Sequence, residues 1–123
     1  MASILVIDDD KQIRDLMRKV LEGAGHTVVD APNGRMDMQL WRVNRSDLII
    51  TDILMPEQDG LELIRELRRD APEAKIIALS GGGQKLHLDT LDLARKFGAV
   101  GTLNKPFGIT ELLDIVQSTL HSS

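Results

Sequence analysis

Residues 4–9 read ILVIDD, and this short stretch decides how the chain folds. Four consecutive apolar residues are typical of a strand that is covered on both faces, as the strands of parallel sheets are. The two acids that follow cannot belong to the core, because an unpaired buried carboxylate is strongly unfavourable. The stretch therefore predicts a buried strand whose carboxyl end carries the acidic pair Asp8 and Asp9.

Two later stretches repeat this arrangement. The run 48–51 ends at Asp52, and the strand-like run 100–104 ends at Lys105. If these strands are parallel neighbours, their carboxyl ends meet in one crevice, where open α/β sheets place their ligands. Three carboxylates and one ammonium in a crevice suit a hard divalent cation and a phosphoryl group. The pattern therefore indicates phosphoryl transfer onto an aspartate.

Strand-like and helix-like segments alternate five times along the 123 residues. The apolar pattern predicts strands at 4–7, 27–29, 48–51, 75–79 and 100–103, and helices near 13–21, 36–43, 60–70, 86–97 and 112–120. Asp59 is expected to cap the third helix, with Glu62 in a capping-box position. Short loops between such segments imply right-handed crossovers and a parallel sheet with helices on both faces. We predict a doubly wound (βα)5 fold of class α/β, forming one domain over residues 1–123 without an output domain.

The composition excludes several classes of protein. The net charge of −4 argues against a nucleic-acid groove, which needs a basic surface. Cysteine is absent, so neither disulfides nor thiolate metal sites can form. No apolar stretch approaches the ~18 residues of a membrane span, and the N-terminus lacks the layout of a signal peptide. We therefore expect a cytoplasmic protein that binds neither nucleic acid nor membrane.

The predicted acidic site is expected to bind a divalent cation. Two unit charges ~5 Å apart repel by about 3 kcal/mol at an effective dielectric constant of ~20. A cluster of Asp8, Asp9 and Asp52 would therefore be relieved by Mg²⁺, which prefers oxygen ligands in octahedral geometry. We expect Asp9 to bind the ion directly, Asp8 to bind it directly or through water, and the carbonyl of Leu54 to complete the shell.

Three residues have the chemistry for the transfer itself. Asp52 is the expected nucleophile, and Lys105 and the hydroxyl of Ser80 are expected to contact phosphoryl oxygens. Each residue alone has a simpler explanation; Asp9 or Asp10, for example, could be only the N-cap of the first helix. The conjunction favours a site, because all of these residues fall at the same edge of one sheet.

The pattern resembles the receiver domain of bacterial two-component response regulators. Its most specific part is the stretch 52–60, DILMPEQDG, which is similar to the family's Asp-x-x-Met-Pro-x-x-(Asp/Asn)-Gly segment. The pair Asp8 and Asp9, the strand-ending Ser80 and the stretch 105–107, Lys-Pro-Phe, match as well. The resemblance covers the whole chain. It implies a flavodoxin-like sheet with strand order 2-1-3-4-5 and a cis peptide before Pro106.

The resemblance also implies a function, that of a phospho-acceptor signalling switch. Asp52 would take a phosphoryl group from a sensor histidine kinase or a phosphotransfer protein, with Mg²⁺ bound at Asp8, Asp9 and the Leu54 carbonyl. The surface of the fourth helix, fifth strand and fifth helix would then change and control a downstream protein target. Such a protein is not an enzyme in the usual sense, since it catalyses only its own phosphorylation and dephosphorylation.

The chain departs from the family pattern at three places. Thr102 stands where the family usually has the aromatic second switch residue. The segment between Ser80 and Lys105 is a few residues longer than usual, and the extra length falls around the glycines 81–83. That loop is expected either to order on phosphorylation or to be merely long. The fourth helix is unusually apolar; Leu88 and Leu93 lie ~140° apart on a helical wheel, so at least one leucine should be exposed.

Three other functions compete with this interpretation. A haloacid-dehalogenase-like phosphatase also uses an aspartate after a strand, but it needs a second aspartate two positions later, where this chain has Leu54. A flavodoxin-like cofactor module needs a phosphate loop after the first strand, and the acids 8–10 would repel that phosphate. A receiver-like module could also signal without phosphorylation, although the intact acidic site argues against it.

Overall fold

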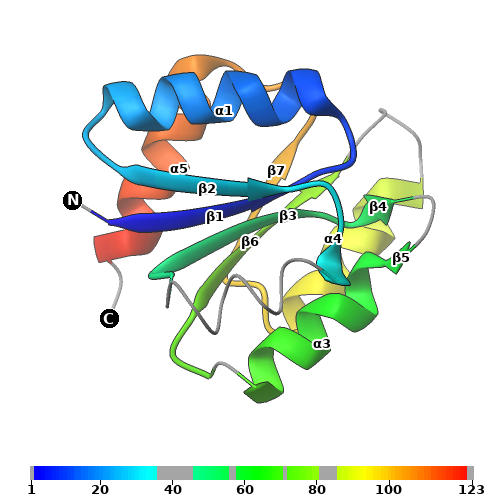
Figure 1. Ribbon diagram of the computed structural model, residues 1–123. Coiled ribbons are helices and arrows are strands. Elements are labelled where there is room, and N and C mark those ends of the chain that lie inside the picture. Colours follow the sequence, from blue (N-terminus) through cyan, green and yellow to red (C-terminus); the bar gives the residue numbers. More distant parts are fainter. Residues whose placement is uncertain (1, 36–45, 56–57, 71, 81–85, 122–123) are drawn as a thin grey trace.

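A five-stranded parallel sheet forms the centre of the molecule. The computed structural model describes residues 2–35, 46–55, 58–70, 72–80 and 86–121 (Figure 1). The strands of the main sheet are β1 (Ser3–Ile7), β2 (Thr27–Ala31), β3 (Leu48–Asp52), β6 (Lys75–Ser80) and β7 (Gly101–Asn104). Their spatial order is β2-β1-β3-β6-β7, and every neighbouring pair is parallel. The α/β class, the doubly wound sheet and the strand order 2-1-3-4-5 are therefore confirmed.

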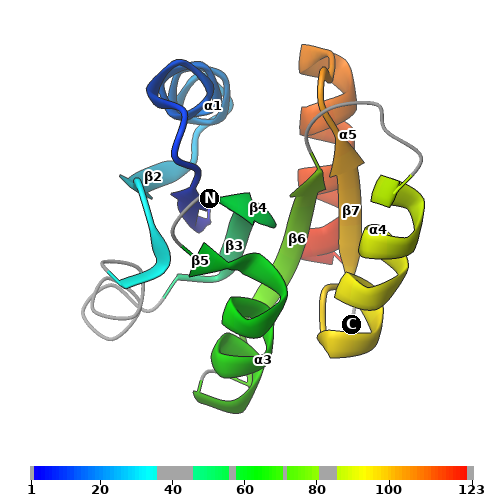
Figure 2. The same ribbon diagram turned by 90° about the vertical axis from the view of Figure 1, so that its right-hand side faces the viewer.

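Helices in the described part of the chain cover both faces of this sheet. They are α1 (Lys11–Gly23), α3 (Gly60–Asp70), α4 (Leu86–Phe97) and α5 (Ile109–His121). Figure 2 shows α1 and α5 on one side of the sheet and α3 and α4 on the other. The helix predicted at 36–43 and the glycine loop at 81–83 lie outside the described residues. None of the helices within the described ranges is both long and apolar enough to cross a bilayer.

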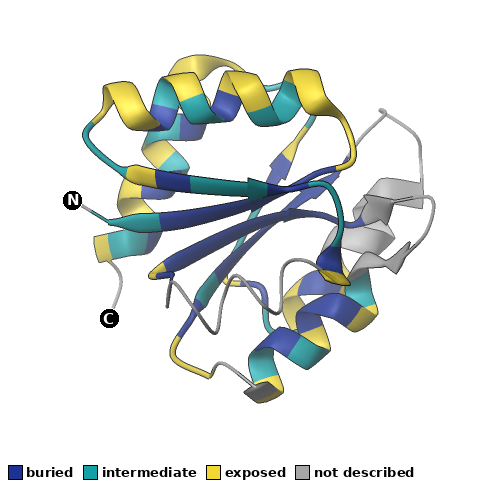
Figure 3. Cartoon of the chain, in the orientation of Figure 1, coloured by how far each residue is buried: buried dark blue, intermediate teal, exposed yellow. Residues whose placement is uncertain are grey.

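The core has two layers, because alternate residues of each strand point to opposite faces of the sheet. On the α3/α4 side, Leu5 and Ile49 pack with the helical stripe of α3; on the α1/α5 side, Ile4 and Ile50 pack with α1 and α5. Figure 3 shows the central strands as almost continuously buried. Among the described residues, the buried apolar residues of the helices are Leu63, Ile64, Leu67 and Ala94 on the first side, and Met17, Leu21, Leu112 and Val116 on the second.

Helix α4 is followed by a glycine whose carbonyl is bonded by α3. Gly98 has a positive φ of 130°, a backbone conformation that residues with a Cβ atom rarely adopt. Arg68 of α3 donates one hydrogen bond to the carbonyl of Gly98 and another to that of Pro72, both at 2.8 Å. Leu93 of α4 is 40% exposed, which confirms that the helix presents a leucine to solvent.

The structure has a short hairpin after β3 that the sequence did not predict. Its strands, β4 (Leu54–Met55) and β5 (Gln58–Asp59), pair antiparallel. Strands of two residues carry no hydrophobic period, so the apolar pattern cannot indicate them. Helix α3 begins directly after Asp59, at Gly60, as expected. The capping contact predicted for Asp59 lies outside the described side chains.

An acidic candidate site at the carboxyl edge of the sheet

The predicted site residues lie at one edge of the sheet because the strands that carry them are parallel. Asp8 follows β1 directly, Asp52 is the last residue of β3, and Lys105 follows β7. Asp8 has no exposed surface and Asp52 is 3% exposed, whereas Asp9 is open to solvent. The strand ends thus place two carboxylates inside the protein and a third at its surface. The expectation that such acids lie outside the core is therefore wrong for Asp8 and Asp52, whose carboxylates are buried beside Lys105, and it holds for Asp9.

These three acids come together in space. One carboxylate oxygen from each of Asp8, Asp9 and Asp52 can be chosen so that all three lie within 4.8 Å of one another. Carboxylate oxygens are hard ligands, which Mg²⁺ prefers, whereas softer metals favour nitrogen or sulfur ligands. The donor set therefore fits a magnesium ion, with Asp8, Asp9 and Asp52 as the residues that would hold it.

Lys105 brings a positive charge directly to this cluster. Its Nζ donates to Asp8 Oδ2 at 2.6 Å and to Asp52 Oδ2 at 3.2 Å. Burial raises the pKa of Asp8, and the nearby Lys105 only partly offsets that rise. Burial lowers the pKa of Lys105, but the hydrogen bond to Asp8 and the charge of Asp52 outweigh it, so the pKa is raised. The lysine therefore stays protonated between the two buried carboxylates.

Ser80 ends β6 with an unsatisfied hydroxyl. The residue is 2% exposed, and its Oγ has no hydrogen-bond partner among the described residues. Its backbone carbonyl accepts a hydrogen bond from the Lys105 N–H at 2.7 Å, which ties the ends of β6 and β7 together. A buried hydroxyl without a partner is uncommon in folded proteins and suits a polar group that binds transiently.

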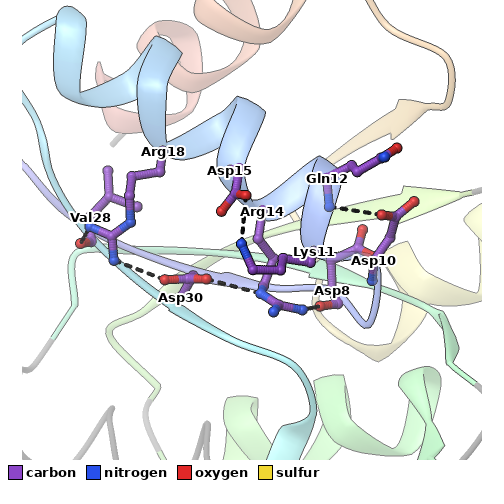
Figure 4. Close-up of polar contacts among 9 residues, drawn as sticks. All are labelled: Asp8, Asp10, Lys11, Gln12, Arg14, Asp15, Arg18, Val28 and Asp30. Atoms are coloured by element: carbon purple, nitrogen blue, oxygen red, sulfur yellow. Dashed lines mark hydrogen bonds and ion pairs between the residues drawn. The ribbon is translucent and has the colours of Figure 1, made fainter.

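The side chain of Asp10, unlike those of Asp8 and Asp9, caps a helix. Asp10 is the N-cap of α1, and its Oδ1 accepts from the Gln12 N–H at 2.9 Å (Figure 4). Its own N–H donates to Asp8 Oδ1, also at 2.9 Å. Asp10 is therefore the N-cap, as the simpler explanation of the acidic run proposed. Asp8 and Asp9 belong instead to the acidic cluster with Asp52.

The remaining predicted residues lie further from the cluster or are only partly described. Leu54 lies in β4, two positions after Asp52, and its metal contact stays a prediction. Thr102 lies in β7, and its Oγ1 accepts a hydrogen bond from Arg95 of α4 at 3.1 Å. The Lys105–Pro106 peptide is cis, as the resemblance implied.

One residue at the site was missed by the sequence analysis. Arg14 of α1 donates to the backbone carbonyl of Asp8 at 2.7 Å. The sequence does place Arg14, a basic residue, in the first turn of the helix predicted after the acidic run, and this position could have indicated a contact with the acids. A helix pattern alone does not show which neighbouring strand such a side chain reaches.

Fold and site together define a class of protein. A five-stranded parallel sheet of order 2-1-3-4-5, with an acidic cluster and a lysine at its carboxyl edge, is the architecture of receiver domains. The chain matches the family model for the response regulator receiver domain over residues 4–117. It belongs to this family.

Similar proteins support this assignment. The chain is 38% identical to the DNA-binding transcriptional regulator NtrC of Azospirillum brasilense, covering 99% of this chain and 25% of that protein. It is 29% identical to sporulation initiation phosphotransferase F of Bacillus subtilis, covering 95% of this chain and 92% of that protein. A receiver domain protein from Clostridium thermocellum superimposes with a TM-score of 0.88 at 32% identity, covering 98% of this chain and 94% of the other.

The relatives differ in length. The chain spans between about a quarter and a half of three of the curated relatives that it matches. It spans nearly the whole of the Bacillus subtilis phosphotransferase. The similarity therefore concerns the receiver domain itself.

Proposed function

We propose that residues 1–123 act as one phospho-acceptor switch in which Asp52 receives a phosphoryl group in the presence of Mg²⁺. The observation that supports this most is the convergence of Asp8, Asp9 and Asp52, with Lys105 bonded to two of them. The donor is a phosphohistidine of a sensor histidine kinase or a phosphotransfer protein. The proposed location is the cytoplasm, where such donors act on receiver domains.

In the proposed transfer, an Asp52 carboxylate oxygen attacks the phosphorus of the phosphohistidine. A P–O bond forms while the P–N bond breaks, and the leaving imidazole keeps the electron pair and takes up a proton. Bound at Asp8, Asp9, Asp52 and the Leu54 carbonyl, Mg²⁺ would neutralise charge on the phosphoryl oxygens. Water later attacks the phosphorus of the acyl phosphate, releases phosphate and regenerates the Asp52 carboxylate.

Lys105 and Ser80 carry the remaining polar contacts. The Lys105 ammonium already lies within reach of Asp52, so it can follow the negative charge from the carboxylate to a phosphoryl oxygen. Ser80 has a buried hydroxyl without a partner among the described residues, and it can donate to a second phosphoryl oxygen. Both movements would draw the ends of β6 and β7 toward Asp52.

These movements connect the site to the surface formed by α4, β7 and α5, which we propose as the partner-binding surface. Thr102 of β7 is bonded to Arg95 of α4, so a shift of β7 is transmitted to that helix. Leu93, Val100 and Ile109 add exposed apolar area on or beside these elements. In this proposal Thr102 serves as the second switch residue through a hydrogen bond, in place of a rotating ring.

Intact-mass measurement tests the phosphoryl transfer. The protein is incubated with phosphoramidate and Mg²⁺ and should gain the mass of one phosphoryl group, with no gain in excess chelator. Asp52→Asn should abolish the gain, whereas Asp10→Asn should retain it, because the Asp10 side chain caps α1 and the substitution keeps the backbone N–H that bonds Asp8. No gain in the unaltered protein, or the same gain in Asp52→Asn, would contradict the proposal.

A further inference from the structure

Arg14 links three parts of the molecule that meet beside the acidic cluster. Its Nη1 donates to the carbonyl of Asp8 at 2.7 Å, and its Nε donates to Asp30 Oδ2 of β2 at 2.9 Å. The side chain is only 13% exposed. Figure 4 shows the guanidinium between the loop after β1 and the end of β2. We propose that Arg14 is a positioning residue for the metal-binding acids, an inference that rests on the proposed function.

The bond to Asp8 acts on the peptide unit that joins the two metal-binding acids. The Asp8 carbonyl belongs to the planar peptide between Asp8 and Asp9, so holding this oxygen orients the plane from which Asp9 continues. The N–H of Asp8 is held separately, by the carbonyl of Ala31 at 3.1 Å. The backbone of Asp8 is therefore restrained on both sides, by β2 directly and by α1 through Arg14.

Asp30 keeps Arg14 in place. Its second oxygen, Oδ1, accepts from Arg18 Nη2 at 2.8 Å, so one carboxylate is shared by two guanidinium groups. Burial would raise the pKa of Asp30, but the hydrogen bonds from Arg18 and Arg14 outweigh it and lower the pKa. Asp30 thus remains charged, and the rigid fork of Arg14 is directed at Asp8 by a fixed partner.

The charge of Arg14 and its positioning of the Asp8–Asp9 peptide predict opposite effects of its removal on the affinity for Mg²⁺. A guanidinium beside a cation site repels the cation, so loss of the charge alone would strengthen Mg²⁺ binding. Loss of an oriented peptide would weaken it, since residues that hold metal ligands in position contribute to metal affinity. The direction of the change in the dissociation constant therefore distinguishes the two roles.

Calorimetric titration with Mg²⁺ measures this direction. We expect Arg14→Gln to raise the dissociation constant about tenfold, the lower end of what a residue behind the ligands contributes. Arg18→Gln is the matched control: Arg18 also pairs with Asp30 and bonds the carbonyl of Val28, but within the described part of the chain its hydrogen bonds do not include Asp8. It should lower the melting temperature and raise the dissociation constant much less than Arg14→Gln does, because Arg14 keeps its own bonds to Asp8 and Asp30.

A kinetic measurement separates positioning from general damage. In phosphorylation by phosphoramidate, Arg14→Gln should shift the Mg²⁺ concentration for half-maximal rate by the same factor while the rate at saturating Mg²⁺ stays close to that of the unaltered protein. If Arg14→Gln does not fold, Arg14→Lys replaces it. That variant keeps the charge, so a severalfold weaker binding can come only from lost geometry.

The outcomes are separable. An unchanged or lower dissociation constant in Arg14→Gln, or in Arg14→Lys where that variant is used, overturns the positioning role. An equal loss of affinity in Arg18→Gln also overturns it. Failure of the unaltered protein to bind Mg²⁺ or to be phosphorylated contradicts the proposed function instead.

Discussion

Lys105 Nζ lies 2.6 Å from Asp8 Oδ2, so the domain supplies a cation to a carboxylate that has no contact with solvent. Asp8 and Lys105 come from opposite ends of the chain. In the sheet, β3 and β6 lie between β1, which precedes Asp8, and β7, which precedes Lys105. Asp52 at the end of β3 shares the same ammonium. One ammonium thus offsets part of the buried negative charge of the site before any metal ion binds, and a net negative charge remains.

Replacing Lys105 tests how much this offset contributes to stability. Lys105→Ala leaves a buried carboxylate without its partner, and we expect the free energy of unfolding without metal to fall by up to about 3 kcal/mol. Mg²⁺ should restore more stability in this variant than in the unaltered protein, because the added ion replaces a lost cation. Urea unfolding with and without Mg²⁺ measures both effects.

The matched control for Lys105 is Lys11, whose ion pair with Asp15 is exposed. Lys11→Ala should change the free energy of unfolding by about 0.5 kcal/mol or less. Equal effects of the two substitutions would show that the buried ion pair of Lys105 stabilises the fold no more than an exposed ion pair does. In addition, Lys105→Ala should impair the structural response to phosphorylation, measured by chemical-shift changes in α4 and β7.

The shared carboxylate of Asp30 predicts a pH dependence. Its pKa in the folded protein lies below the ordinary value of 3.8, because the hydrogen bonds from Arg18 and Arg14 outweigh the effect of burial. The unfolded chain therefore takes up this proton first as the pH falls. The stabilisation is complete above the unfolded pKa and is lost as the pH falls through the folded pKa.

Unfolding measured as a function of pH tests this prediction. Asp30→Asn should be less stable than the unaltered protein by about 1–2 kcal/mol near neutral pH, and the difference should shrink below about pH 4. Asp15→Asn, which alters an exposed acid on α1, should show a small difference throughout. A difference for Asp30→Asn that stays constant down to low pH would contradict the pairing.

Gly98 predicts a local cost of adding a side chain. A Cβ atom there would lie 2.9 Å from Arg68 Nε, and the positive φ disfavours any residue but glycine. Gly98→Ala should therefore destabilise the protein by about 1–3 kcal/mol. Gly23→Ala is the control, because a Cβ atom at Gly23 of α1 meets nothing within 4 Å; alanine there should stabilise the helix by up to about 1 kcal/mol. Similar effects of the two substitutions in thermal unfolding would refute the argument.

The sequence predicts the strands of this fold well because they are buried on both faces. Apolar runs mark them, but their ends depend on hydrogen bonding between strands. Asp30, although charged, lies within β2 because it pairs with Val6 of β1. Likewise Asp52 belongs to β3, opposite Leu79 of β6. Residue type alone could not place either boundary.

The acids and the lysine of the site could be predicted for a similar reason. Each one ends a strand, and parallel strands bring their ends together whatever lies between them in the sequence. The strand order itself came from the family resemblance, since the apolar pattern is compatible with several orders. Arg14 could not be predicted, because its contact depends on how α1 lies over β2.

The two layers of the core have a consequence for how this domain can diversify. Among the described residues, the buried apolar side chains of the two layers form separate sets, since each strand residue faces one helix pair or the other. Substitutions at distant, independent sites add in their effects on stability. Substitutions in the core layer beneath α1 and α5 can therefore accumulate without matching substitutions in the layer beneath α3 and α4. A lineage could remodel one flank for a new binding protein while the opposite flank, and the strands between them, keep their inherited packing.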